Sequence, residues 1–209
     1  MDTSISFDVR AVEQFLKQHQ HGPKVVKALR LRTASHWLDP TIDRLSSRML
    51  EAYAKLCEIV EWPFNILDCG CMCGYLNHFM ELNLPPEKRN FRYVGIDNWP
   101  EALKVAEEFQ PRIDVRQADI LKDELPGPFD YVWCSNIAFG DHDAVVKTLY
   151  PLATKALIFA QPPWAGNVIV PMRELGKVEV FNCGETTLYK LDATNHIRRT
   201  QDLHSRLSA

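Results

Sequence analysis

A short apolar run that ends in an acid and continues into a glycine turn is the strongest structural signal in this chain. Residues 65–74 read NILDCGCMCG, and a helical pattern follows directly after Gly74. A strand, a tight turn and a helix N-terminus together present backbone N–H groups to a ligand. The stretch therefore predicts a site for a nucleotide-like cofactor.

The spacing of glycines and acids in this region separates two kinds of nucleotide site. A dinucleotide-binding fingerprint has the form G-x-G-x-x-G and is followed by an acid about 20 residues later. Here Gly70 and Gly74 stand four apart with Met72 between them, and Asp68 precedes the first glycine. A second acid, Asp97, ends the next apolar run. The pattern does not match the dinucleotide fingerprint.

Apolar runs and amphipathic segments alternate through the middle of the chain. We expect strands at 65–68, 92–96, 113–117, 129–135 and 155–160, and helices at 74–84, 99–110 and 141–149. This alternation predicts an α/β fold with a parallel sheet covered by helices on both faces. Residues 177–181 and 186–191 alternate in hydrophobicity around a turn, which predicts a C-terminal antiparallel hairpin.

The ends of the chain differ from this central part. Short helical patterns occur at 7–19 and 24–31, and Asp39-Pro40 resembles the start of an amphipathic helix that runs to Val60. We therefore divide the chain into an N-terminal helical segment or lid at 1–60, a cofactor-binding domain at 61–194 and a polar tail at 195–209.

Composition narrows the classes of partner. A formal net charge of −3 argues against a protein that binds nucleic acid mainly through its overall field, although a local basic patch stays open. No apolar run approaches the roughly 20 residues that span a bilayer, and the N-terminus has no apolar signal core. Cys69, Cys71 and Cys73 have no second ligand cluster, so we expect no metal site. The cysteine contexts indicate reduced thiols and a cytoplasmic protein.

Four motifs in order resemble the class I (Rossmann-like) S-adenosylmethionine (SAM)-dependent methyltransferases. Asp68, Gly70 and Gly74 occupy three of the four marked positions of that family's first motif, and Met72 replaces the middle glycine. Asp97 stands at the second motif and Asp119 at the third. Residues 129–136 resemble the fourth strand. The resemblance, over about 60–192, implies a three-layer sandwich with a mostly parallel seven-stranded sheet that the terminal hairpin closes.

The resemblance also implies roles for individual residues. Asp68 would orient the amino group of SAM, and Asp97 would accept hydrogen bonds from the ribose hydroxyls, since a carboxylate is an acceptor with two oxygens. Asp119 would accept from the adenine amino group. The full set of expected cofactor-binding residues is Asp68, Gly70, Cys71, Gly74, Asp97, Asn98, Trp99, Asp119, Ile120, Ser135 and Asn136. For Trp99, packing against the next helix is an equal alternative.

The acceptor side carries weaker signals. His142 follows the fourth strand and is a candidate general base, with a solvated histidine at a helix start as the alternative. His36 and Trp37 are candidates for lining the substrate pocket or for packing. Residues 161–164 read QPPW, which differs from the Asp-Pro-Pro-Trp signature of adenine-N6 methyltransferases and follows the fifth strand. We interpret it as a strand-ending turn.

The leading hypothesis is a SAM-dependent methyltransferase that acts on an O or N atom of a small molecule and releases S-adenosylhomocysteine (SAH). A second hypothesis is methylation of RNA or protein, because Arg30, Arg32, Arg44 and Arg48 could form a basic face. A third is a catalytically silent module that binds SAM or a partner, since a fold does not fix a function.

Overall fold

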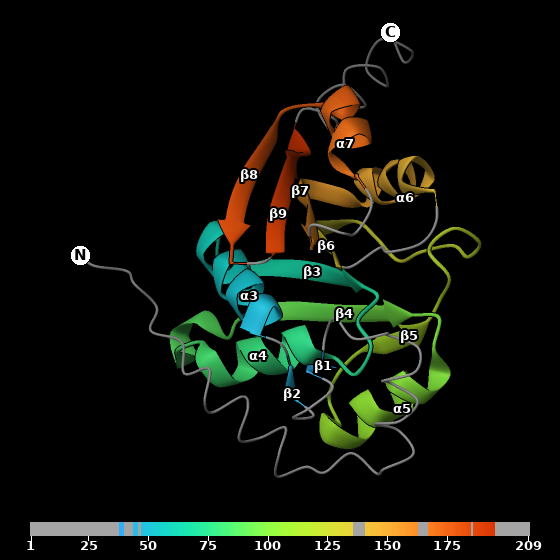
Figure 1. Cartoon of the computed structure of the whole chain (residues 1–209). Helices are drawn as coiled ribbons and strands as arrows, with labels where there is room; N and C mark the ends of the chain where they lie inside the picture. Colours follow the sequence, from blue (N-terminus) through green and yellow to red (C-terminus); the bar gives the residue numbers. More distant parts are fainter. Residues whose placement is uncertain are drawn as a thin grey trace, which may run out of the picture.

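Within the residues described by the computed structural model, seven strands form one sheet. Those residues are 38–39, 44–45, 47–135, 141–162, 167–184 and 186–194. The strand order is β5-β4-β3-β6-β7-β9-β8, so the chain starts in the middle of the sheet and crosses over between β5 and β6. Figure 1 shows the hairpin strands β8 and β9 at one end and β5 at the other.

The five strands from β5 to β7 are parallel, and β9 pairs antiparallel with both β7 and β8, so β8 runs in the same direction as β7. Their bounds are β3 Phe64–Cys69, β4 Phe91–Asp97, β5 Val115–Gln117, β6 Phe129–Ser135, β7 Ala153–Gln161, β8 Val178–Cys183 and β9 Thr186–Asp192. This arrangement confirms the expected Rossmann-like class, a mostly parallel sheet closed by a C-terminal antiparallel hairpin.

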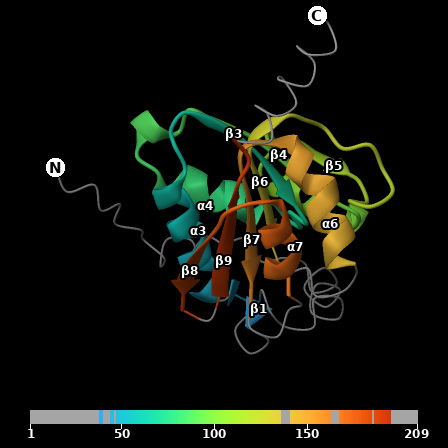
Figure 2. The same cartoon turned by 90° about the horizontal axis from the view of Figure 1, so that it is seen from above.

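Helices cover both faces of the sheet. One apolar cluster joins the sheet to α3 (Ser47–Ile59), α4 (Tyr75–Asn83) and α5 (Pro100–Phe109), and the other joins it to α6 (His142–Leu149) and α7 (Ile169–Leu175). Figure 2 shows α3 and α4 on one side of the strands and α6 and α7 on the other. Two 3₁₀ turns, η1 (Pro86–Lys88) and η2 (Tyr150–Leu152), precede β4 and β7.

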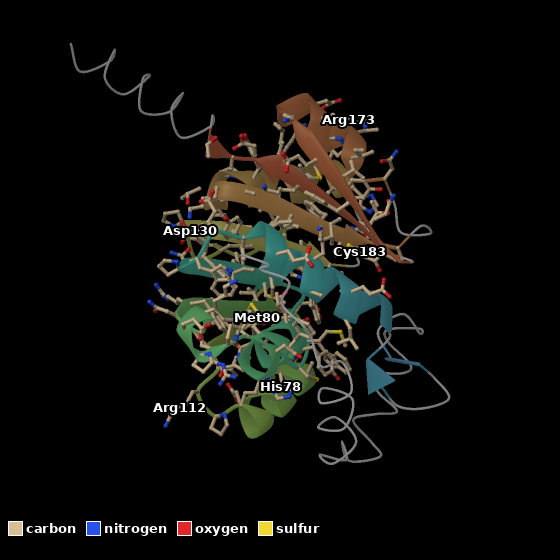
Figure 3. The ribbon with its side chains drawn as sticks, turned by 90° about the vertical axis from the view of Figure 1, so that its left-hand side faces the viewer. His78, Met80, Arg112, Asp130, Arg173 and Cys183 are labelled. Atoms are coloured by element: carbon tan, nitrogen blue, oxygen red, sulfur yellow. The ribbon has the colours of Figure 1, made fainter. Side chains whose placement is uncertain are left out.

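The sheet has two edges where strands begin or end, and one of them is formed by the carboxyl ends of the parallel strands. Asp130 lies at the start of β6 and Cys183 at the end of β8, and Figure 3 shows them at opposite ends of the strands. The carboxyl ends of β3, β4, β6 and β7 therefore meet at the edge that Cys183 marks. In open α/β sheets, ligands bind outside this carboxyl edge.

The sequence-based elements match the structure in the centre of the chain. The helix expected to run from Asp39 to Val60 is confirmed over α3, and only its start is wrong, because Leu38–Asp39 (β1) pairs with Arg44–Leu45 (β2) and α3 begins at Ser47. An Asp-Pro pair starts turns as well as helices, so it did not decide between them. Helix α7 was not expected, since Pro171 interrupts its short pattern.

No helix among the described residues is both long enough and apolar enough to cross a bilayer. The helices expected at 7–19 and 24–31 and the tail at 195–209 lie outside the described residues.

Candidate functional site

The loop after β3 is tied to the end of β4 by backbone hydrogen bonds. The N–H groups of Gly70 and Cys71 both donate to the carbonyl oxygen of Ile96, at 2.8 and 3.0 Å. The N–H of Gly74 then closes the turn on the carbonyl of Cys71 at 2.9 Å. These bonds fix the loop at the carboxyl edge of the sheet, directly before α4.

Three residues in this loop have a left-handed backbone. Gly70 has φ +78°, Met72 +50° and Gly74 +71°. Glycine adopts this region at no steric cost, whereas an L-residue pays roughly 1–2 kcal/mol. Met72 therefore has a backbone conformation that glycine adopts without steric cost, and its side chain, 8% exposed, joins the apolar cluster beside α3 and α4.

Asp97 connects the loop to the end of β4. Its carboxylate accepts a hydrogen bond from the N–H of Met72 at 2.9 Å and another from the N–H of Trp99 at 2.9 Å. A carboxylate is an acceptor with two oxygens and about four acceptor positions. Asp97 is only partly buried. The side chain is thus held in place and still able to accept hydrogen bonds.

Asp68 is buried at 3% exposure on the α3 and α4 side of the sheet. The hydroxyl of Tyr93 donates to its Oδ2 at 2.7 Å. Burial raises the pKa of the Asp68 carboxyl to about 7, the bond from Tyr93 lowers it, and the charge of Asp97 raises it. A carboxyl in this state can ionise near neutral pH when a cation such as an ammonium group approaches.

The two glycines of the loop face different surroundings. A Cβ placed on Gly70 would have only the backbone oxygen of Ser135, at 3.9 Å, within 4 Å among the described residues. A Cβ on Gly74 would instead collide with the side chain of Ile113. Among the described residues, a Cβ on Gly70 therefore meets only an ordinary van der Waals contact, whereas Gly74 is required for packing against the segment that follows α5.

Gly95 is required by a close approach between the loop and β4. A Cβ on Gly95 would lie 2.7 Å from Sγ of Cys71 and 3.0 Å from the hydroxyl of Tyr93. Cys71 itself is 4% exposed. The side chain of Cys71 therefore packs on β4, and only its backbone remains for contact with a ligand.

The other expected residues around β4 and β6 separate into exposed and buried ones. Asn98 is exposed, while Trp99 is 6% exposed and belongs to the cluster beside α4. Ser135 ends β6 with 8% exposure at the same edge as the loop. Asn136, His36 and Trp37 lie outside the described residues.

Asp119 and Ile120 form a turn after β5. The Asp119 carboxylate accepts from the N–H of Leu121 at 3.0 Å and pairs with Lys122 at 2.6 Å. The bond from Lys122 and the bond from Leu121 hold the pKa of Asp119 below its usual range. Its side chain is thus engaged locally, and Ile120 packs against the cluster beside α6.

His142 is the first residue of α6. Its neighbour Asp141 caps the helix by accepting from the N–H of Ala144 at 3.1 Å. Asp143 pairs with Lys147 at 2.7 Å. The described structure therefore places His142 at a capped helix start on the carboxyl edge.

The loop cysteines are buried thiols. Burial raises the pKa of Cys73 to about 12 and holds that of Cys71 well above its usual range. Metal binding and nucleophilic attack both require the thiolate. Among the described residues, no group of three or more His, Cys, Asp or Glu side chains is arranged to hold a metal ion.

Tyr93 is a site residue that the sequence reading missed. It lies two residues before Gly95 on β4, in the alternation of a strand, where an aromatic residue usually signals only core packing. A buried carboxyl needs a hydrogen-bond donor. The burial expected for Asp68 near the end of β3 could therefore have indicated a polar partner such as Tyr93 on the neighbouring strand.

Comparison with known proteins identifies this arrangement. Residues 66–154 match the family model described as a methyltransferase domain. They include the glycine loop, Asp97 and Asp119. This segment is thus similar to the methyltransferase domain, and the fold around it is that of the class I SAM-dependent methyltransferases. That family uses SAM as its methyl donor. No curated protein shows significant sequence similarity.

Solved structures share the methyltransferase fold. Coclaurine N-methyltransferase, bound to N-methylheliamine and SAH, superposes with TM-score 0.50 at 18% identity over 73% of this chain and 49% of its own. The magnesium protoporphyrin IX methyltransferase from Synechocystis PCC 6803, with bound SAM, gives TM-score 0.53 at 15% identity, covering 69% and 77%. The N-methyltransferase NodS from Bradyrhizobium japonicum gives 0.55 at 18%, covering 69% and 96%. This chain thus spans about half of the first of these proteins.

Proposed function

We propose that this protein transfers the methyl group of SAM to an O or N atom of a small molecule. The observation that carries the proposal is the position of Asp97, whose carboxylate is fixed to the glycine loop at the carboxyl edge of the sheet. The partial exposure of Gly70 supports it, since a ligand can reach its backbone.

The residues around the loop fit the chemical groups of SAM. Asp97, partly exposed and held by the N–H groups of Met72 and Trp99, would accept from the ribose hydroxyls. Asp68, with its pKa raised to about 7, would pair with the amino group. Asn98, Asp119, Ile120 and Ser135 would line the remaining cofactor surface. The bound cofactor supplies a methyl group already activated by its sulfonium.

The protein's contribution is to hold the acceptor in line with that methyl group and to exclude water. A base is needed only when the acceptor must lose a proton first, and we assign that role to His142 at the start of α6. We further propose that the segment 1–60, with His36 and Trp37, covers the acceptor. Within that segment, α3 packs against the face of the sheet that carries Ile66.

The similar structures support a small acceptor. Coclaurine N-methyltransferase and magnesium protoporphyrin IX methyltransferase both act on small molecules by their names. The net charge of −3 supports the same class, since a protein that grips RNA carries a basic surface. All six cysteines are free and buried, which supports a reducing compartment such as the cytoplasm.

Methyl transfer is tested by incubating the protein with SAM that carries a labelled methyl group. The acceptors are a library of phenols and amines and, separately, total RNA and a protein extract. We expect label in small molecules, SAH in equal amount, and no product with Asp97→Ala. Label in RNA that falls steeply with salt would replace this proposal with RNA methylation. Binding of SAH without turnover on any acceptor would indicate a silent module.

A further inference from the structure

Gln161 is the last residue of β7 and lies at the same edge as the glycine loop. Its neighbour Ala160 is paired with Ser135, the last residue of β6. β6 lies between β7 and β3, so about two strand spacings, ~10 Å, separate the line of Gln161 from that of Gly70. A small planar molecule spans this distance.

Among the described residues, the buried amide of Gln161 has no hydrogen-bond partner. The residue is 3% exposed, and neither its oxygen nor its nitrogen forms a hydrogen bond with any residue that the structure describes. An amide offers one acceptor oxygen and two N–H donors. Buried side-chain amides are nearly always satisfied, so this one requires an explanation.

Gln110 is a structural glutamine of the same chain whose side-chain amide is hydrogen-bonded. Its nitrogen donates to the carbonyl of Gly74 at 3.1 Å, and its oxygen accepts from the side chain of Asn77 at 2.8 Å. Gln110 thereby holds the start of α4. Gln161 makes no such contacts within the described residues.

The strand around Gln161 would accept an apolar side chain. Leu157 and Phe159, which point to the same face of β7, are both fully buried in the cluster beside α6 and α7. A methionine has the length of glutamine and would continue this face without an unsatisfied polar atom. An unpaired buried amide destabilises the free protein. Because Gln161 lies at the carboxyl edge where ligands bind, a bound ligand that forms its hydrogen bonds explains why the amide is there.

We propose that Gln161 recognises the methyl acceptor, and that this acceptor presents a hydrogen-bond donor and an acceptor side by side. A carboxamide, a lactam or another –NH–C(=O)– unit has this form. The amide oxygen of Gln161 accepts from its N–H, and the amide nitrogen donates to its carbonyl. The inference rests on the proposed function, because it places the acceptor beside the methyl donor.

The test compares Gln161→Met with the matched control Gln110→Met. Melting temperature is measured without ligand, SAH affinity by calorimetry, and fragment binding by saturation-transfer NMR with and without SAH. The probes are benzamide and 2-pyridone, with methyl benzoate as a similar molecule that lacks the N–H donor.

We expect Gln161→Met to raise the melting temperature by about 2–8 °C, because two unsatisfied polar atoms are removed. SAH affinity should stay within about twofold, and binding of benzamide and 2-pyridone should weaken at least about tenfold. Methyl benzoate should bind weakly and equally to both proteins. Gln110→Met should lower the melting temperature. Gln161→Glu, which replaces the N–H donors, should favour benzamidine over benzamide.

Three outcomes would overturn the inference. Gln161→Met could lower the melting temperature as Gln110→Met does, which would show that the amide has a structural role such as holding a buried water. The two amide probes could bind wild type and Gln161→Met equally, or fail to bind wild type at all. If the protein fails to bind SAH but Gln161→Met still weakens binding of benzamide and 2-pyridone, only the proposed function is contradicted.

Discussion

The carboxylate of Asp97 accepts a hydrogen bond from the backbone N–H of Met72 at 2.9 Å, and this bond connects the end of β4 to the loop that follows β3. A single side chain therefore has two tasks. It holds the loop at Met72, whose backbone is left-handed, and its partly exposed carboxylate can accept hydrogen bonds from a ligand.

Replacing Asp97 by alanine should remove both tasks. We expect Asp97→Ala to weaken SAH binding at least about tenfold, or 1.4 kcal/mol, because hydrogen bonds to a charged acceptor are lost. Asp114→Ala is the matched control, since that acid pairs with Arg116 at the surface. Calorimetry with SAH measures both variants. Equal affinities of Asp97→Ala and wild type would remove Asp97 from the site.

Asp68 should make the stability of the protein depend on pH. Its folded pKa is about 7 against an ordinary 3.8, so between these values the unfolded carboxyl is ionised while the folded one keeps its proton. Raising the pH through this window therefore lowers the free energy of unfolding, by on the order of 4 kcal/mol in total. The effect levels off above pH 7.

Asp68→Asn should lack this dependence. In urea unfolding at pH 4.5, 6 and 8, the free energy of unfolding of the variant should rise relative to that of wild type as the pH rises. Its SAH affinity at pH 8 should be about tenfold or more below that of wild type. Asp119→Asn is the control, because the pKa of Asp119 is lowered from 3.8, so its difference in stability from wild type should stay constant between pH 4.5 and 8. A constant difference between Asp68→Asn and wild type would contradict the raised pKa.

The left-handed backbone at Met72 predicts an order of stability among variants. Met72→Ala loses the buried side chain and keeps the strained φ of +50°, whereas Met72→Gly loses the side chain and the strain. Met72→Gly should therefore be more stable than Met72→Ala by about 1 kcal/mol, with both below wild type. Chemical denaturation gives these values. Equal or reversed stability of the two variants would show that the backbone is unstrained.

The close contact between Gly95 and Cys71 can be tested by a double-mutant cycle. Gly95→Ala should cost about 1–3 kcal/mol, because its Cβ would lie 2.7 Å from Sγ of Cys71. Cys71→Gly in the same chain removes the collision, so the double variant should be more stable than the sum of the singles by about 0.5–3 kcal/mol. Strict additivity would mean that the two residues do not touch.

Much of the central fold could be predicted from sequence. Strands such as Phe129–Ser135 and helices such as His142–Leu149 lie within a residue or two of their expected bounds, because alternation and amphipathic spacing report directly on burial. The region around Asp39 was misread, since Asp-Pro serves both turns and helix starts. Domain boundaries at 60 and 194 stay predictions.

Site residues could be predicted where their position in the sequence alone places them at the end of a strand. Asp68 and Asp97 follow apolar runs, so the ends of their strands bring them to one edge. Contacts between distant segments could not be predicted: the bond from Tyr93 to Asp68, the role of Gly74 against Ile113, and the local pairing of Asp119 with Lys122. These depend on how the strands and turns pack, which spacing in one sequence does not contain.

The central claim is that the loop between β3 and α4 binds SAM. Calorimetric titration of the purified, cofactor-free protein with SAM and with SAH tests it most directly. The account predicts saturable binding of both ligands at one site per chain, with SAH affinity rising between pH 6 and 8 as Asp68 ionises. Absence of heat and of any thermal stabilisation by either ligand at millimolar concentration would contradict it.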